Sequence, residues 1–449
     1  MKEKRKMKEF DNVIIGSGFR ALITAYFCLK KKKNVIVISN SKNLSGVLKP
    51  IEWDGAKIDK GYQFFDGLDL YSKNILEEFV GKENLHDFGY GAASLTNGKI
   101  YNNHAIPYWP YHGKIFSLSA IISILLKILK KKTDNTKIES YSDLIKNYPS
   151  NIRKILSEAC KRNFSCPPEK VSFLSEEFSP FLCFRLTLFP DMVGKFLKNK
   201  FPALDNILAI RRQSLGEVNY SLYPKNKNMG FIADIMENKL RDEGVVFETS
   251  NETKIHYNND LIVQTDNFKI NCKKIFLTTE LDDTYNFFEN KPKLSKSNYY
   301  VPQIFFIFKT SKILSKFQYV MGNDLKLLIN RASNISLYGE KTSDGKCIII
   351  AEVPMKPTSE IWENPELVVD KVWNELKIMK MVDENEIMSK YDIFKAEKTF
   401  CLPLVNFSKN LKVLKNFIKE KYNNQILIPS AGRTTRGNYI KDLREHFND

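Results

Sequence analysis

The chain has 449 residues, 43% of them hydrophobic, which is enough to bury a large core in two or more domains. Its formal net charge is +17, but the lysines are scattered and no nucleic-acid motif accompanies them, so we expect solvated faces and no nucleic-acid partner. The seven cysteines are dispersed and the five histidines form no pair at ligand spacing. This pattern argues against a metal site and favours a reducing, cytoplasmic compartment. The charged first ten residues lead into a strand, so no signal peptide is expected.

Residues 10–41 predict one complete dinucleotide-binding unit. An apolar strand at 13–15 is followed by a turn, a helix at 21–29 and a second strand at 35–38. Gly16 permits the tight turn, Gly18 lets the backbone approach a pyrophosphate, and Ala21 lets the helix pack on the strand. Because the turn lies between a strand and a helix, the motif has the context that it requires. The predicted cofactor contacts in this turn are Gly16, Ser17, Gly18, Phe19, Arg20 and Ala21.

The second strand ends in Ser39 and Asn40, where such units usually carry an acid that bonds the adenosine ribose. Both residues can still bond a ribose hydroxyl as neutral groups, so we include them among the cofactor contacts. The missing charge weakens the case for NAD and leaves open a larger cofactor with other anchors.

Residues 115–132 form an apolar segment that ends in three lysines. About 20 apolar residues are needed to span a bilayer, so this segment is too short. A buried helix of a substrate domain is the favoured interpretation. An interfacial helix at a membrane surface stays open, and it would suit a lipid-linked substrate.

Residues 43–66 contain Gly46 after the second strand and the glycine-led run 61–65 after a predicted hairpin. This arrangement resembles the second flavin motif of the FAD-dependent amine oxidase and protoporphyrinogen oxidase-like superfamily, and the motif order is most similar to that of the UDP-galactopyranose mutases. The resemblance implies FAD as the cofactor, with the run 61–65 beside the isoalloxazine ring. The cofactor contacts that it implies here are Gly46, Val47, Gly61, Tyr62, Gln63 and Phe64.

Residues 424–442 predict a buried strand at 425–428, a turn of small residues and a helix beginning near Gly437. A helix N-terminus at this place favours an anion. The Gly432-Arg433 pair and Tyr439 resemble the mutase branch, in which the tyrosine contacts the substrate diphosphate. The resemblance therefore implies cofactor contacts at Gly432 and Arg433, and catalytic roles for Arg433 and Tyr439.

The central block of the chain resembles the return of such chains to the FAD domain. It predicts a helix at 231–241, a strand at 246–249 that joins the sheet, a hairpin at 254–270 and a strand at 276–279. The last of these strands places Thr278 near the cofactor.

Two further catalytic candidates are Gln63 and Arg185. The mutases carry histidines where this chain has Gln63 and Asp66, and the Gln63 amide can bond a substrate hydroxyl or the flavin edge. A solvent-facing glutamine stays open as the alternative. Arg185 lies in an apolar run and can present its guanidinium to a diphosphate, although a structural ion pair explains it equally well.

The expected architecture is α/β, with a Rossmann-like FAD-binding domain of the glutathione-reductase type and an inserted α+β substrate domain. The FAD-binding domain is expected at residues 1–105, 220–290 and 395–449, and the substrate domain at 106–219 and 291–394. Within the substrate domain, helices are predicted near 115–130, 140–147, 151–163 and 364–380, and strands at 302–308 and 347–352.

The resemblance implies an FAD-dependent enzyme that acts on a nucleotide-activated sugar or a related small molecule, in surface polysaccharide biosynthesis, by mutase-like or oxidoreductase chemistry. Two alternatives stay open: a flavin-dependent oxidase or desaturase of an amine or lipid-linked substrate, and a non-catalytic relative that keeps the fold for binding. We expect a small anionic substrate and a cytoplasmic protein. A homodimer and a peripheral membrane contact through 115–132 are open.

Overall fold

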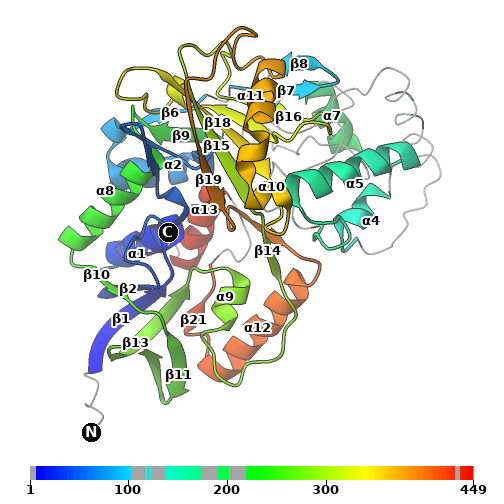
Figure 1. Cartoon of the computed structure of the whole chain (residues 1–449). Coiled ribbons are helices and arrows are strands. Elements are labelled where there is room, and N and C mark those ends of the chain that lie inside the picture. The colour runs from blue at the N-terminus through cyan, green and yellow to red at the C-terminus, as the bar shows by residue number, and fades with distance from the viewer. Residues whose placement is uncertain are drawn as a thin grey trace.

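The computed structural model describes residues 7–89, 91–102, 118, 122, 138–146, 148–173, 191–201, 204, 219–429 and 435–447. A sheet with five parallel strands forms its lower part in Figure 1. Four strands follow the order β10-β2-β1-β13, and the fifth, β21, pairs with the end of β13. The hairpin β11-β12 continues the sheet beyond β13 as antiparallel strands. The bounds are β1 (Met7–Ile15), β2 (Val35–Ser39), β10 (Val246–Thr249), β11 (Lys254–Asn258), β12 (Asp260–Gln264), β13 (Lys269–Leu277) and β21 (Ile426–Leu427).

Helices cover both faces of this sheet. The β2 strand is buried throughout, and its side chains alternate between the faces, so that Val35 and Val37 join one apolar cluster and Ile36 and Ile38 join another. The first cluster includes α1 (Gly18–Lys30), α2 (Leu70–Val80), α8 (Met229–Asp242) and α13 (Arg436–Phe447); the second includes α9 (Leu281–Tyr285) and α12 (Phe407–Tyr422). The predicted Rossmann-like domain is thus confirmed.

A second sheet of seven strands lies above the first in Figure 1. Its order is β19-β15-β18-β17-β16-β7-β8, and neighbouring strands are antiparallel except for β16 and β7. One face shares the first apolar cluster, and α10, η6 and α11 cover the other. The bounds are β7 (Ala92–Thr96), β8 (Lys99–Asn102), β15 (Gln303–Thr310), β16 (Tyr319–Gly322), β17 (Arg331–Asn334), β18 (Cys347–Pro354), β19 (Lys390–Ala396), α10 (Glu360–Glu363), η6 (Pro365–Val368) and α11 (Val369–Ile378).

The chain passes between the two sheets more than once. The β7 and β8 strands fall within residues 1–105, yet they extend the second sheet. The two-stranded β14-β20 pair joins Asn298–Tyr300 to Cys401–Pro403. The predicted strands at 302–308 and 347–352 correspond to β15 and β18, whereas the division of the whole chain into two domains stays a prediction.

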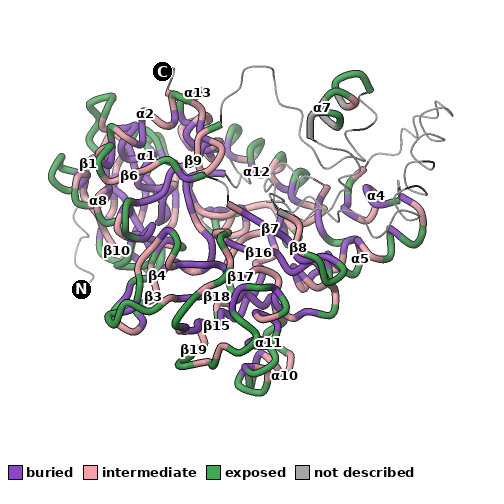
Figure 2. Tube along the Cα trace, turned by 90° about the horizontal axis from the view of Figure 1, so that it is seen from above, coloured by how far each residue is buried: buried purple, intermediate pink, exposed green. Residues whose placement is uncertain are grey.

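Helices occupy the right side of Figure 1: α4 (Tyr141–Ile145), α5 (Ser150–Phe164) and α7 (Asp191–Lys200). The Ser140 hydroxyl accepts a hydrogen bond from the Asp143 backbone N–H (3.1 Å), which caps α4. Figure 2 shows exposed residues along α7. Most of the segment 115–132 lies outside the described residues; within it, Leu118 and Ile122 are exposed. No helix in the described ranges is long and apolar enough to cross a membrane.

Two further short sheets occur. The first is the hairpin of β3 (Ile51–Trp53) and β4 (Ala56–Ile58), and the second joins β5 (Phe65–Leu68), β9 (Tyr220–Pro224) and β6 (Leu85–Asp87). Single 3-10 turns occur at η1 (Gly46–Leu48), η2 (Lys82–Asn84) and η5 (Ile335–Leu337).

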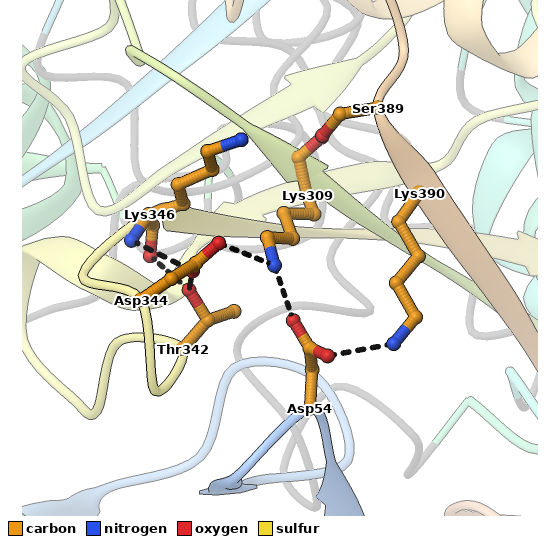
Figure 3. Close-up of polar contacts among 7 residues, drawn as sticks. All are labelled: Asp54, Lys309, Thr342, Asp344, Lys346, Ser389 and Lys390. Carbon is orange, nitrogen blue, oxygen red and sulfur yellow. Dashed lines mark hydrogen bonds and ion pairs between the residues drawn. The ribbon is translucent and has the colours of Figure 1, made fainter.

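An ion-pair network fastens the tip of the β3-β4 hairpin to the second sheet (Figure 3). The Asp54 carboxylate pairs with the ammonium groups of Lys309 on β15 (2.6 Å) and Lys390 on β19 (2.6 Å). Lys309 also pairs with Asp344, in the loop between η5 (Ile335–Leu337) and β18 (2.7 Å). Because the hairpin leads directly into residues 59–66, the network fixes that segment relative to the second sheet.

Candidate active site

A cavity of about 760 Å³ lies at the carboxyl ends of the parallel strands, where open α/β sheets bind their ligands. Ile15, Ile38 and Thr278, at the ends of β1, β2 and β13, line one side of it. Gln303 and Arg331, from the second sheet, line the other side. The cavity therefore separates the dinucleotide-binding unit from the second sheet.

Three glycines form the floor of the cavity. Gly16, Gly18 and Gly46 have positive φ angles of 138°, 74° and 59°, a conformation that side chains disfavour. A Cβ on Gly16 would overlap the Thr278 hydroxyl, and one on Gly46 would lie 3.0 Å from the Gly18 Cα. The two turns therefore pass each other without room for side chains, and their backbones face the cavity.

The α1 helix begins at this floor and has no local partner for its positive end. The preceding Ser17 makes no side-chain cap, and the first turn contains no acidic residue. A helix N-terminus of this kind leaves backbone N–H groups and a partial positive charge for an anion. Ser17, Phe19 and Arg20 line the cavity, whereas Ala21 is buried in the core beneath it.

The predicted adenosine contacts also reach the cavity. Ser39 and Asn40 line it at the end of β2, beside Ser250 and Thr253 of the segment that connects β10 to β11. Thr278 is held at the end of β13 because its hydroxyl donates to the Ile15 carbonyl over 3.1 Å. These hydroxyls offer neutral contacts, in agreement with the absence of an acid after β2.

Residues 61–65 are the segment predicted to lie beside the flavin. Some of them line the cavity, and others pack behind those that do. Gln63 lines the cavity, and its amide nitrogen donates to the carbonyls of Val47 (3.2 Å) and Lys60 (3.3 Å). Val47 and Tyr62 line it too, and the Tyr62 hydroxyl donates to Gln318 over 2.7 Å. Phe64 is buried in ring contact with Tyr62, so it supports this segment from behind.

Arg436, at the start of α13, orients Gln63. Its guanidinium donates to the Gln63 side-chain oxygen (3.0 Å) and to the Phe64 carbonyl (2.6 Å). Burial lowers the pKa of Arg436, and the nearby carboxylates of Asp66 and Asp59 oppose that effect. Sequence reasoning selected Arg433 from the same run and missed Arg436, whose signal was its place at the predicted helix start.

A buried ion pair from the second sheet also lines the cavity, beside Gly61 and Tyr62. Arg331 donates from Nε and Nη2 to the two oxygens of Glu352, over 2.7 and 2.8 Å. Burial acts to lower the pKa of Arg331, but the Glu352 carboxylate outweighs it and raises that pKa. Gly61 (φ 74°) lies so close to Glu352 that a Cβ added to it would be 2.5 Å from the Glu352 Oε1. No local motif marks this pair in the sequence.

Tyr439 lines the cavity, but its hydroxyl is engaged within the first domain. The hydroxyl lies 2.9 Å from that of Thr24, which donates its own proton to the Arg20 carbonyl (2.7 Å). Tyr439 is therefore the donor in this contact. Burial raises the pKa of Tyr439, which keeps the phenol neutral. Gly432, Arg433 and Arg185 lie outside the described residues, so their predicted roles stay predictions.

The charged groups around the cavity differ in whether they are paired. Among the carboxylates, Glu280 pairs with Arg20 (3.2 Å) and Asp283 accepts from the Tyr300 hydroxyl (3.0 Å). Lys60 and Lys398 also line the cavity, and neither has a carboxylate partner in the described part of the chain. Burial and the charge of Lys49 lower the pKa of Lys60. The described residues contain no group of three or more potential metal ligands.

No protein-family model and no curated protein sequence matches this chain. Solved structures do match over nearly its full length. A reduced UDP-galactopyranose mutase has a TM-score of 0.71 at 12% identity and covers 97% of this chain and 93% of its own. A putrescine oxidase with bound putrescine has a TM-score of 0.60 at 12% identity, with 99% of each chain covered.

Cyclohexylamine oxidase from Brevibacterium oxydans has a TM-score of 0.63 at 10% identity, with 98% of each chain covered. Identities this low establish the fold alone. The chain therefore has the fold that these mutase and amine oxidase structures share, as the motifs at its two ends predict.

Proposed function

We propose that the chain is an FAD-dependent enzyme, mutase-like or an oxidoreductase, that acts on a nucleotide-activated sugar or another small anionic molecule. The cofactor proposal is supported by the three positive-φ glycines and by the uncapped start of α1, which together suit a pyrophosphate at the cavity floor. The shared fold supports the reaction class, because the similar structures include a mutase and two oxidases.

Different residues would contact different parts of the FAD. Ser17 and Phe19 would hold the pyrophosphate at the start of α1, and Ser39 and Asn40 would bond the adenosine end. Gly46, Val47, Gln63 and Thr278 would contact the ribityl and ring end, with Gly432 and Arg433 as predicted additions. The flavin supplies hydride transfer in the oxidoreductase case, or a nucleophilic nitrogen of its reduced form in the mutase case.

One observation supports a negatively charged substrate. Among the described residues that line the cavity, each carboxylate accepts a hydrogen bond from an arginine or a tyrosine, whereas two lysines have no carboxylate partner. Glu280 and Glu352 have arginine partners, and Asp283 has a tyrosine partner. A cationic amine would have to compete with an arginine for either glutamate. An anion meets Lys60 and Lys398 directly, so the cavity favours an anionic substrate over an amine.

The proposal is tested by titrating the FAD-loaded chain with UDP-galactose and, in parallel, with putrescine, while the flavin absorbance is followed without oxygen. We expect UDP-galactose to perturb the flavin bands saturably, and putrescine neither to perturb nor to bleach them. Bleaching by putrescine, with no response to UDP-galactose, would favour amine oxidation and contradict the proposed substrate class.

A further inference from the structure

One edge of the second sheet combines a buried amide with two unpaired cations. Gln303 begins β15 and pairs with Ala396 at the end of β19. Its side chain is on the same face as Phe305 and Ile307, because residues two apart in a strand share a face, and both of these belong to the first apolar cluster, which also includes α1 and α13. Gln303 therefore faces the cavity, which it lines.

The Gln303 amide has no partner within the part of the chain that the structure describes. Gln303 is only 3% exposed, yet no side-chain hydrogen bond of it occurs there. Because Gln303 lines the cavity, a ligand there can satisfy its amide. Gln63, by contrast, has both ends of its amide engaged, by Val47, Lys60 and Arg436. The Gln303 amide, unlike that of Gln63, is thus free to meet a ligand.

The two lysines lie over aromatic rings near the end of β19, Lys60 from the segment after β4 and Lys398 from the segment after β19. The Lys60 ammonium lies 5.3 Å from the ring centre of Phe394, two residues before Ala396. The Lys398 ammonium, two residues after Ala396, lies 4.8 Å from the ring centre of Tyr300. Aromatic faces hold both ammonium groups without neutralising them. The neighbouring Glu352 does not neutralise them either, because Arg331 binds both of its oxygens.

We propose that Lys60, Gln303 and Lys398 form the subsite for a phosphate or diphosphate group of the substrate. The two ammonium groups supply the charge at the cavity rim, and the Gln303 N–H₂ donates to a phosphate oxygen deeper inside. This subsite rests on the proposed function and specifies it, since it names the residues that select an anion. It also leaves the glycine floor and α1 to the cofactor.

The test measures binding of UDP and of inorganic pyrophosphate by isothermal titration at low and high salt. The variants are Lys60→Gln, Lys398→Gln and Gln303→Leu. Lys395→Gln is the matched control: it lies on β19, three residues before Lys398, but its ammonium donates to the Glu363 carbonyl (3.2 Å) and does not line the cavity. We expect each cavity lysine variant to bind UDP about tenfold more weakly, with a smaller salt dependence, and Gln303→Leu about fivefold more weakly. The control should bind as the wild type does.

Flavin content and thermal midpoint are measured on every variant, and the titrations are also made on the chain as purified. A wild-type chain that binds neither UDP nor pyrophosphate would overturn the subsite. So would lysine variants that keep wild-type affinity. Failure of the chain to bind FAD is a separate readout that counts against the proposed function.

Discussion

The guanidinium of Arg436 and the side-chain oxygen of Gln63 are joined by a 3.0 Å hydrogen bond, across 373 positions of the sequence. The same guanidinium donates to the Phe64 carbonyl. The α13 helix thus holds residues 63 and 64, which lie beside the cavity. Its Arg436 also directs the Gln63 side-chain oxygen toward α13. Arg436 therefore fixes the orientation of the Gln63 amide together with the Val47 and Lys60 carbonyls, which accept from its nitrogen.

We predict that Arg436→Lys weakens FAD binding by about tenfold, because lysine cannot make both charge-assisted contacts at once. Flavin fluorescence during titration of the apoprotein measures this affinity. Arg444→Lys is the control, since Arg444 is exposed at the other end of the same helix, over the Tyr71 ring. Unchanged affinity in Arg436→Lys, with an unchanged flavin spectrum, would show that Gln63 needs no such support.

Asp59 is expected to make stability depend on pH. It is buried beside the Tyr223 hydroxyl (2.7 Å) and the Met229 N–H (2.9 Å), and burial raises its pKa from 3.8 to about 7. The folded chain therefore keeps a proton that the unfolded chain has already released between these values. The stability that this proton supplies is complete below about pH 4 and is lost as the pH rises to about 7.

Urea unfolding of the wild type and of Asp59→Asn across this range measures the effect. Relative to the variant, the wild type should lose up to about 4 kcal/mol of unfolding free energy between about pH 4 and pH 8. A constant difference between the two proteins would mean that Asp59 has the same pKa in the folded and unfolded chains.

Tyr439→Phe distinguishes a structural role from the substrate role that the family resemblance implies. Since the hydroxyl donates to Thr24, the variant should lose about 1 kcal/mol of unfolding free energy. Its UDP affinity should equal that of the wild type. A loss of UDP affinity without loss of stability would instead place the hydroxyl on the substrate.

The hairpin network in Figure 3 should make the protein sensitive to salt. Asp54→Asn removes the pairs with Lys309 and Lys390, which also hold the pKa of that carboxyl below its ordinary value. We expect a lower thermal midpoint at low salt, with the difference shrinking near 1 M salt, where screening acts over about 3 Å. Glu384→Gln, which breaks only an exposed pair with Lys380, should change little at either salt concentration. Equal midpoints for Asp54→Asn and wild type at low salt would show that the network does not hold the hairpin.

Local patterns explain how much of the fold could be predicted. Gly16, Gly18 and Ala21 lie within six residues of one another, and their spacing alone fixes a strand, a turn and a helix. The strand at 246–249 and the helix after Gly437 could be placed for similar reasons, and both occur as β10 and α13. The pairing of β7 with β16 had no such signal, because it joins segments more than 200 residues apart.

The opposite wall of the cavity could not be predicted for the same reason. Arg331 and Glu352 become partners only because β17 and β18 pair in one register, and Gln303 reaches the cavity only through the pairing of β15. In the sequence these residues lie in ordinary strand patterns without glycines or charge runs. Local turns thus define the side of the cavity that we propose for the cofactor, whereas the side that we propose for the substrate depends on tertiary register.

The most direct test of the whole account is the flavin content of the purified chain and of Gly18→Val, measured by absorbance and by release of FAD on denaturation. Gly244→Val is the matched control, because Gly244 also has a positive φ (90°) but open space around its Cα. We predict a yellow wild-type chain with about one FAD per chain, a control that keeps it, and a folded Gly18→Val that has lost it. A colourless wild-type chain that cannot be reconstituted, or a folded Gly18→Val with full flavin content, would contradict the account.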